Sequence, residues 1–361
     1  MSQVGAGRMT GTRWARLAAY LAGQGLAVDD ATAPRRCQGG LANENWEIRL
    51  TTGEGLIVRR APAGDLPPGA NDRSREHRVL TRLADAYPLA PRSFVLCDDP
   101  GVIGAPFVVL EQRSGEALHH GSTRAAALAI AQARTLAAAT VDAIAALHDI
   151  DPRSVGLDDL GKPAGFAMRT ARRWIDRAAS RALPNDVATA CDVTARWLVK
   201  NEPVDGPPVI LHNDVKIDNF LFDFDRARLH PTALLDWDQC TRGAAELDIA
   251  MCLVYWIEPD DPPEADLIEV VPRRSTGTVT RADLVARYAA TSARALDDLT
   301  WFRTLATFKA AVIFHHQLPA TAPDARSATA MRELGCALFV VAHDLAVRSH
   351  ARGARRRAAA T

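Results

Sequence analysis

The stretch from residue 209 to 238, VILHNDVKIDNFLFDFDRARLHPTALLDWD, constrains the fold and site of this chain more than any other. Polar residues stand at the ends of its short apolar runs: Asp214, Asn219 five positions later, and Asp236. Short apolar runs bounded by polar residues predict strands, and side chains at strand ends can converge on one point. The apolar runs are residues 209–211, 220–222 and 233–235.

The spacing His-x-Asp-x-x-x-x-Asn, followed by an Asp at a strand end, is the spacing that kinase-type phosphoryl transfer needs. Asp214 is the candidate catalytic base, or orienting group, for an acceptor hydroxyl, and Lys216 is a candidate contact for the γ-phosphate. Magnesium takes oxygen ligands, so Asn219 and Asp236 are candidate metal ligands. Asp238 is either a second metal contact or an acid that stabilises the loop.

Residues 38–60 predict a turn between strands and a phosphate-binding strand. Gly39 and Gly40 would let backbone amides approach phosphates, with Asn43 in the same turn, although an ordinary hairpin also explains a glycine pair. Strand alternation places Arg59 on the side of an inward apolar residue, which makes it the candidate cation for the α- and β-phosphates. Arg60 is equally well explained as a solvated arginine at the strand edge.

Residues 72–86 predict a helix whose inward face carries Val79, Leu80 and Leu83. Glu76 lies on that face and is the candidate partner of the strand cation; the alternative is a solvated charge among neighbouring basic residues. Runs at 94–97 and 106–111 predict an antiparallel strand pair. Its last residues and the segment beyond are expected to border the adenine: Leu110, Glu111 and Arg113.

The second half of the chain reads as mainly helical. Residues 123–148 contain no Gly or Pro and many alanines, which predicts one long core helix. Five further helices are expected over 165–182, 185–199, 248–256, 281–295 and 299–315, and another over 331–349.

Composition excludes several classes of partner. Lys plus Arg and Asp plus Glu both number 43, so the net charge of zero does not favour nucleic acid or a membrane surface. The six cysteines show no Cys-x-x-Cys pair and no zinc spacing, which is typical of reduced thiols in a cytosolic protein. The N-terminal apolar stretch is too short for an export signal. We expect a cytoplasmic, soluble protein.

Several motifs resemble the aminoglycoside phosphotransferase family, in particular the branch related to kinase domains joined to acyl-CoA dehydrogenases. The resemblance covers roughly residues 14–345. The chain departs from the family pattern at Asn213, where glycine is usual, and in having arginine in place of the strand lysine. Besides the glycine turn and the catalytic stretch, the motifs are LIVRRAP (56–62), REHRVL (75–80), ALHDIDP (146–152), LDWD (235–238) and LDIA (247–250).

The resemblance implies an α+β, protein-kinase-like bilobal fold. It implies an N-terminal lobe over residues 1–113, with a small antiparallel sheet and one long helix, and a larger helical lobe over 114–361. Asp248 resembles the family acid that ties down the catalytic loop, and His212 is expected to brace that loop. The implied cofactors are ATP and Mg²⁺, and the implied partner is a small molecule with a hydroxyl.

Three functional interpretations stay open at this point. The family branch suggests a kinase of a hydroxyacyl thioester or a related metabolite. An aminoglycoside kinase would need a strongly acidic acceptor site, and the acidic segment 258–264 is followed by Arg273 and Arg274. A nucleotide-binding pseudokinase is supported by the arginine in place of lysine and opposed by the presence of Asp214, Asn219 and Asp236.

Overall fold

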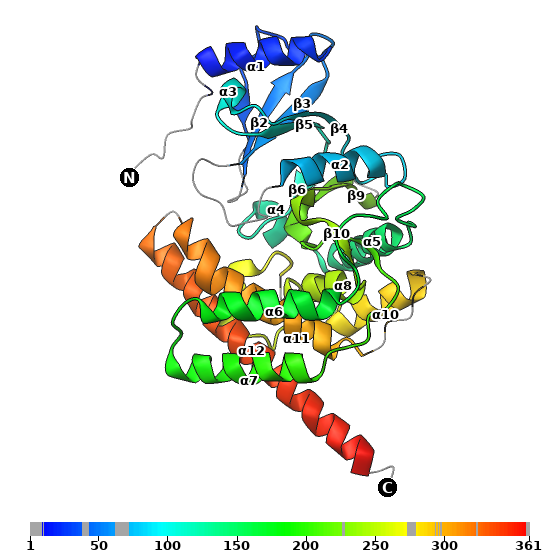
Figure 1. Cartoon of the computed structure of the whole chain (residues 1–361), viewed down its shortest axis with the longest axis vertical. Coiled ribbons are helices and arrows are strands. Elements are labelled where there is room, and N and C mark those ends of the chain that lie inside the picture. Colours follow the sequence, from blue (N-terminus) through cyan, green and yellow to red (C-terminus); the bar gives the residue numbers. More distant parts are fainter. Residues whose placement is uncertain are drawn as a thin grey trace. The chain divides into compact units, whose positions relative to one another are not determined.

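The computed structural model describes residues 9, 11–37, 43–61, 72–225, 228–272, 279–292, 294, 296, 298–322 and 324–358. The chain divides into two compact units (Figure 1). The first unit is Met1–Gly115 with Thr232–Cys240, and the second unit is Glu116–Pro231 with Thr241–Thr361.

The first unit is built on a five-stranded sheet in which neighbouring strands run antiparallel, in the order β1-β2-β3-β5-β4. Its strands are β1 (Arg35–Arg36), β2 (Glu44–Arg49), β3 (Gly55–Arg60), β4 (Ser93–Cys97) and β5 (Phe107–Glu111). Its helices are α1 (Gly11–Gly23), α2 (Arg73–Leu83), α3 (Pro100–Ile103) and the 3₁₀ turn η2 (Trp237–Gln239). The antiparallel strand pair expected at 94–97 and 106–111 is confirmed as β4 and β5.

The core of the first unit lies between this sheet and α1. The apolar side of α1 contributes Leu17 and Leu21, and the sheet contributes Val58 and Phe107; all four are fully buried. Helix α2 packs against β4 and against η2. The returning segment Thr232–Cys240 is held to this unit by backbone contacts, among them a hydrogen bond from the Leu234 N–H to the Leu89 carbonyl.

The second unit is mainly helical (Figure 1). Its α-helices are α4 (Thr123–Ala126), α5 (Ile130–His148), α6 (Phe166–Ala179), α7 (Asn185–Lys200), α8 (Glu246–Val254), α10 (Arg281–Thr291), α11 (Thr300–Val312) and α12 (Ala325–Ala358). Short helices are η1 (Ile217–Asn219), η3 (Pro263–Ile268), η4 (Ile313–Gln317, a π-helix) and η5 (Leu318–Ala320). Its strands are β6 (Glu116–Ala117), β7 (Val209–Leu211), β8 (Phe220–Asp225), β10 (Thr241–Gly243) and the start of β9 (Arg228–Leu234).

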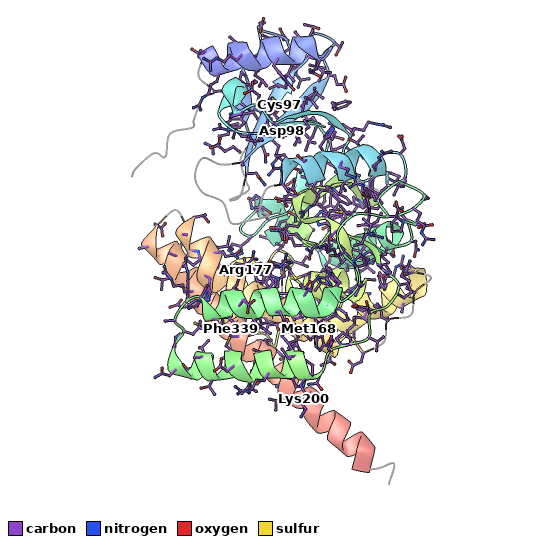
Figure 2. The ribbon with its side chains drawn as sticks, in the orientation of Figure 1. Cys97, Asp98, Met168, Arg177, Lys200 and Phe339 are labelled. Carbon is purple, nitrogen blue, oxygen red and sulfur yellow. The ribbon has the colours of Figure 1, made fainter. Side chains whose placement is uncertain are left out.

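Large apolar side chains fill the core of the second unit. Met168 of α6 and Phe339 of α12 belong to one buried cluster with α7, α8 and α11 (Figure 2). The Phe308 ring of α11 meets the Phe339 ring edge-on, with centroids 5.3 Å apart. Within the described part of the chain, α5 alone is long and apolar enough to cross a membrane. This is weak evidence for a membrane span, because half of that stretch is buried in the fold, as in an ordinary core helix.

The prediction of one helix over residues 123–148 is wrong. Helix α4 ends near Ala127, and α5 begins only at Ile130 after an extended Ala129. Local capping accounts for the break: Ser122 Oγ accepts from the Ala125 N–H at the start of α4, and Gln132 Oε1 accepts from the Ala129 N–H at the start of α5. Leu128, between the two helices, is buried.

Candidate active site

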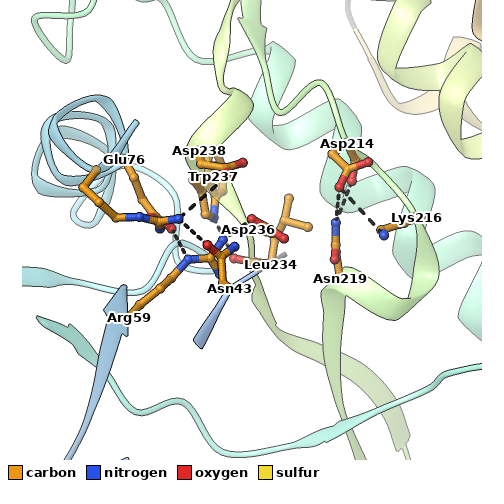
Figure 3. Close-up of polar contacts among 11 residues, drawn as sticks. Asn43, Arg59, Glu76, Asp214, Lys216, Asn219, Leu234, Asp236, Trp237 and Asp238 are labelled. Carbon is orange, nitrogen blue, oxygen red and sulfur yellow. Dashed lines mark hydrogen bonds and ion pairs between the residues drawn. The ribbon is translucent and has the colours of Figure 1, made fainter. Parts of the chain in front are cut away.

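A buried network of charges lies at one end of β3 in the first unit. Arg59 Nε lies 3.2 Å from Glu76 Oε1, and Arg59 Nη2 pairs with Asp236 Oδ1 (Figure 3). The ion pair between strand arginine and helix acid that the sequence predicts is therefore present. Burial alone would lower the pKa of Arg59, but the carboxylates of Asp236 and Glu76 raise it above its ordinary value.

Helix α2 places Glu76 in this network. The helix begins at Asp72, whose carboxylate accepts from the Arg75 N–H, and Glu76 follows on the buried face with Val79 and Leu80. Only 1% of the Glu76 surface is exposed, and a carboxylate so buried needs partners to stay ionised. It has two, because Arg73 also pairs with Glu76 through Oε2.

Arg73 is a further member of the network, and the sequence did not single it out. It is 3% exposed and donates to Asn43 Oδ1, and its Nη2 lies 4.0 Å from Asp238 Oδ2. Burial lowers the pKa of Arg73. The spacing of Arg73 three residues before Glu76 could have shown that both share the inward helix face.

Asp236 and Asp238 flank Trp237 in the returning segment. The Trp237 indole N–H donates to the Leu234 carbonyl at 2.7 Å, and its ring packs against Tyr87, which fixes the turn between the two acids. Asp236 adopts a left-handed conformation with φ of 71°, a strained geometry for a residue with a side chain. Burial, and then the charge of Asp236, raise the pKa of Asp238 to about 7.

These two acids fit a divalent cation. Asp238 is 7% exposed, and its Oδ1 has no hydrogen-bond partner among the described residues. Two neighbouring carboxylates with a buried, unsatisfied oxygen are the donor set that a hard cation such as Mg²⁺ takes. In this structure the Asp236 carboxylate is shared with Arg59, so a bound metal would compete for it.

The segment that ends β5 is tied into the first unit. Arg113 donates to the carbonyls of Thr232 and Pro88, and Glu111 Oε2 accepts from the Arg92 N–H. The Glu111 N–H bonds to the Arg92 carbonyl, so it is occupied within the unit. The adenine contacts expected of Leu110, Glu111 and Arg113 stay a prediction.

Gly39 and Gly40 lie outside the described residues, and their phosphate contact likewise stays a prediction.

The predicted catalytic loop lies in the second unit, between β7 and β8. Asn219 Nδ2 donates to the Asp214 carbonyl at 2.8 Å and to Asp214 Oδ2 at 3.1 Å (Figure 3). Lys216 Nζ lies 3.9 Å from Asp214 Oδ2 and 3.6 Å from Asp218 Oδ2. Asn219 uses its amide nitrogen to hold Asp214. This leaves its amide oxygen as a candidate ligand for a metal.

Asp248 of α8 braces this loop, as expected. Its two carboxylate oxygens accept from the backbone N–H groups of His212 and Asn213, both at 2.7 Å. His148 Nε2 lies 3.3 Å from Asp248 Oδ2, and Tyr288 contacts the other ring nitrogen of His148 at 2.8 Å. All these side chains except that of Asn213 are fully buried, so the loop rests on a connected polar network in the core.

Lys309 of α11 is a second brace, and the sequence reading did not single it out. Its ammonium donates to the Asn213 carbonyl at 2.8 Å, and it is 2% exposed. Burial lowers the pKa of Lys309 to about 8. Asn213 has a left-handed φ of 67°, which asparagine tolerates better than most residues and which explains why asparagine can stand where glycine is usual.

The predicted site residues thus fall into two groups. Asn43, Arg59, Glu76, Asp236 and Asp238 meet in the first unit. Asp214, Lys216 and Asn219 meet in the second unit.

The chain is similar to parts of several curated proteins. Acyl-CoA dehydrogenase family member 11 of Gallus gallus is 30% identical over 233 residues, which cover 63% of this chain and 29% of that protein. Acyl-CoA dehydrogenase family member 10 of Mus musculus is 28% identical over 224 residues, which cover 62% of this chain and 20% of that protein. The chain therefore matches less than a third of the length of these relatives.

Solved structures show the same fold. A putative aminoglycoside phosphotransferase from Ralstonia eutropha superposes with a TM-score of 0.71 at 22% identity, covering 93% of this chain and 98% of that one. An ethanolamine kinase of Plasmodium vivax superposes with a TM-score of 0.56 at 11% identity, covering 87% and 82%. The predicted α+β, protein-kinase-like fold is confirmed.

A model of the phosphotransferase enzyme family (APH) matches residues 34–272, which is more than half of the chain. The chain belongs to this phosphotransferase family.

Proposed function

We propose that this enzyme transfers the γ-phosphate of ATP, with Mg²⁺, to the hydroxyl of a small acyl thioester or a related hydroxy-acid derivative. The proposal rests first on the Arg59 network, which offers a cation for nucleotide phosphates beside carboxylates for a metal. The acyl acceptor is suggested by the curated relatives, which are named as acyl-CoA dehydrogenase family members.

In this proposal the first unit binds the nucleotide phosphates. Arg59 contacts the α- and β-phosphates, and Glu76 keeps its fork in place from α2. Arg73 binds both Glu76 and Asn43. Arg59 is therefore positioned by a polar network rather than by a single ion pair.

In the second unit, Asp214 accepts or orients the proton of the acceptor hydroxyl. The Asn219 amide fixes the Asp214 carboxylate, and Lys216 supplies a nearby positive charge for the transferred group. Asn219 is the candidate Mg²⁺ ligand in this unit, and Asp236 and Asp238 are the candidate Mg²⁺ ligands in the first unit. When bound, the metal neutralises charge on the phosphates during transfer.

An aminoglycoside acceptor fits the charges less well. The acidic segment that could attract a polycation is partly engaged: Arg281 pairs with Glu258 at 3.3 Å and with Asp261 at 2.5 Å. Lys216 places a cation 3.9 Å from the Asp214 carboxylate, which disfavours a polycation beside the candidate catalytic acid. An acceptor without multiple positive charges, such as an acyl-CoA, suits this position better.

The acceptor class can be tested by measuring ADP release with a panel of hydroxyacyl-CoAs, free hydroxy acids and aminoglycosides. We expect release above the ATP-only background with a hydroxyacyl-CoA and none above background with aminoglycosides. The reverse preference would overturn the acyl acceptor and leave the phosphotransferase activity itself in place.

A further inference from the structure

The first unit contains a cavity that the phosphotransferase site does not use. It has a volume of about 100 Å³. Consecutive residues of a strand point to opposite faces of the sheet, so Arg60 at this cavity and Arg59 in the charge network face opposite ways. The lining residues are Met9, Arg13, Arg36, Glu44, Trp46, Arg60 and Ile103.

Arg60 and Glu44 form the buried side of the cavity. Arg60 Nε donates to Glu44 Oε2 at 2.7 Å, and Nη1 donates to the Ile103 carbonyl at 2.6 Å. The Arg60 guanidinium also lies over the Trp46 ring, 5.1 Å from its centroid. Arg36 reaches the same glutamate only at 3.9 Å. The cavity is therefore lined by one carboxylate, that of Glu44, and by the guanidinium groups of Arg13, Arg36 and Arg60, which leaves an excess of positive charge.

Two of these cations, Arg60 and Arg13, approach the same point at Gly104. Gly104 has a φ of 93°, and a side-chain carbon there would lie 3.3 Å from Arg60 Nη1 and 3.7 Å from Arg13 Nη2. Arg13 reaches this point from α1, and it forms no ion pair with any described residue. Like charges brought together in a partly buried place repel each other unless an anion lies between them.

We propose that this cavity binds a tetrahedral oxyanion, namely a phosphate group, at a site separate from the catalytic one. Arginine forks match phosphate oxygens through paired charge-assisted hydrogen bonds, and Arg13 and Arg36 are the arms available for this. The volume far exceeds the roughly 10–15 Å³ that one water needs. The ligand is inorganic phosphate or the phosphate group of a small monoester.

The test is calorimetric titration of the full chain with inorganic phosphate, at constant ionic strength and with saturating Mg²⁺ and ADP to fill the catalytic site. We expect saturable binding at one site. The double variant Arg13→Ala/Arg36→Ala should bind phosphate at least about tenfold more weakly, since it loses two charge-assisted contacts.

The matched control is Arg16→Ala/Arg35→Ala. Arg16 lies on α1 and donates to the Gly101 carbonyl, and Arg35 pairs with Glu47; neither lines the cavity. This variant should bind phosphate like wild type. The proposal is overturned if wild type shows no saturable binding, or if the control and the Arg13/Arg36 variant lose affinity equally.

A second titration with glycerol phosphate separates the two sources of the ligand. Binding of both compounds supports a site open to monoesters, and binding of inorganic phosphate alone supports a site for the free ion. Thermal melts of every variant, together with ADP binding, check that the fold and the catalytic site stay intact.

Discussion

Arg59 and Arg60 are adjacent in β3 but have different partners. Arg59 pairs with Glu76 and Asp236, whereas Arg60 pairs with Glu44 and the Ile103 carbonyl. We expect Arg59→Ala to raise the apparent KM for ATP about tenfold or more, since a charge-assisted contact contributes about 1.5–3 kcal/mol. Arg60→Ala should change it much less. Initial rates against ATP concentration measure both, and the reverse order would show that Arg60 is the phosphate cation.

Lys309 allows a prediction about pH. Burial lowers its pKa from 10.5 to about 8, so between these values the unfolded chain binds more protons than the folded one. Stability therefore rises with pH across this window, and the cost of burying the charge is fully present below it. Wild type should gain up to about 3 kcal/mol relative to Lys309→Met between about pH 7 and about pH 10.

Urea unfolding of both proteins across this range measures the difference. A stability difference between wild type and Lys309→Met that does not change with pH would mean that Lys309 titrates normally. At constant pH near neutrality, Lys309→Met should lower kcat more than it changes the KM for ATP, because it loosens the Asn213 carbonyl next to Asp214.

The residue scale also shows what sequence reasoning can reach. The Arg59–Glu76 pair follows from strand and helix periodicity, which places side chains on a known face. The Asp248 brace was expected only from the family resemblance. Arg73 and Lys309 were missed because basic residues on helices are usually solvated. Only the fold brings carboxylates or carbonyls against them, so their burial is a tertiary effect.

At the scale of elements, helix α2 positions both Arg73 and Glu76, and its start depends on Asp72. Asp72→Ala removes the side chain that caps the helix and should cost about 1 kcal/mol of stability. It should also weaken ATP binding, because the first turn of α2 carries the network. Asp72→Asn keeps a capping oxygen and is the control. Chemical denaturation measures the loss of stability, and ATP titration measures the loss of ATP binding. Equal losses in Asp72→Ala and Asp72→Asn would mean that the Asp72 charge, and not its capping oxygen, is responsible.

The break between α4 and α5 shows why element boundaries were predicted less well than elements. Alanine favours helix everywhere in residues 123–148, so propensity gives no stopping point. The first helix ends because Leu128 is buried and Gln132 caps a new helix. Both features depend on local geometry that an alanine-rich sequence does not reveal.

At the scale of the whole molecule, the nucleotide should stabilise the folded chain by mass action. At a concentration of about 100 times Kd, Mg²⁺ and ATP should add about 2.7 kcal/mol. If Asp236 and Asp238 hold the metal, Asp236→Asn should remove most of the Mg²⁺-dependent stabilisation by ATP. The stabilisation that ATP gives without Mg²⁺ should remain. Thermal melts with ATP, with and without EDTA, measure this, and a shift that EDTA leaves unchanged would contradict a metal at these acids.

The most direct measurement follows the phosphate itself. ATP labelled in its γ-phosphate is incubated with Mg²⁺ and a hydroxyacyl-CoA, and the products are analysed by mass spectrometry for wild type and Asp214→Asn. We predict a phosphate ester on the acyl hydroxyl, formed in step with ADP, and a rate lower by about a hundredfold or more in Asp214→Asn. Equal rates in the two proteins, or ADP formed without label on the hydroxyl, would contradict phosphoryl transfer directed by Asp214.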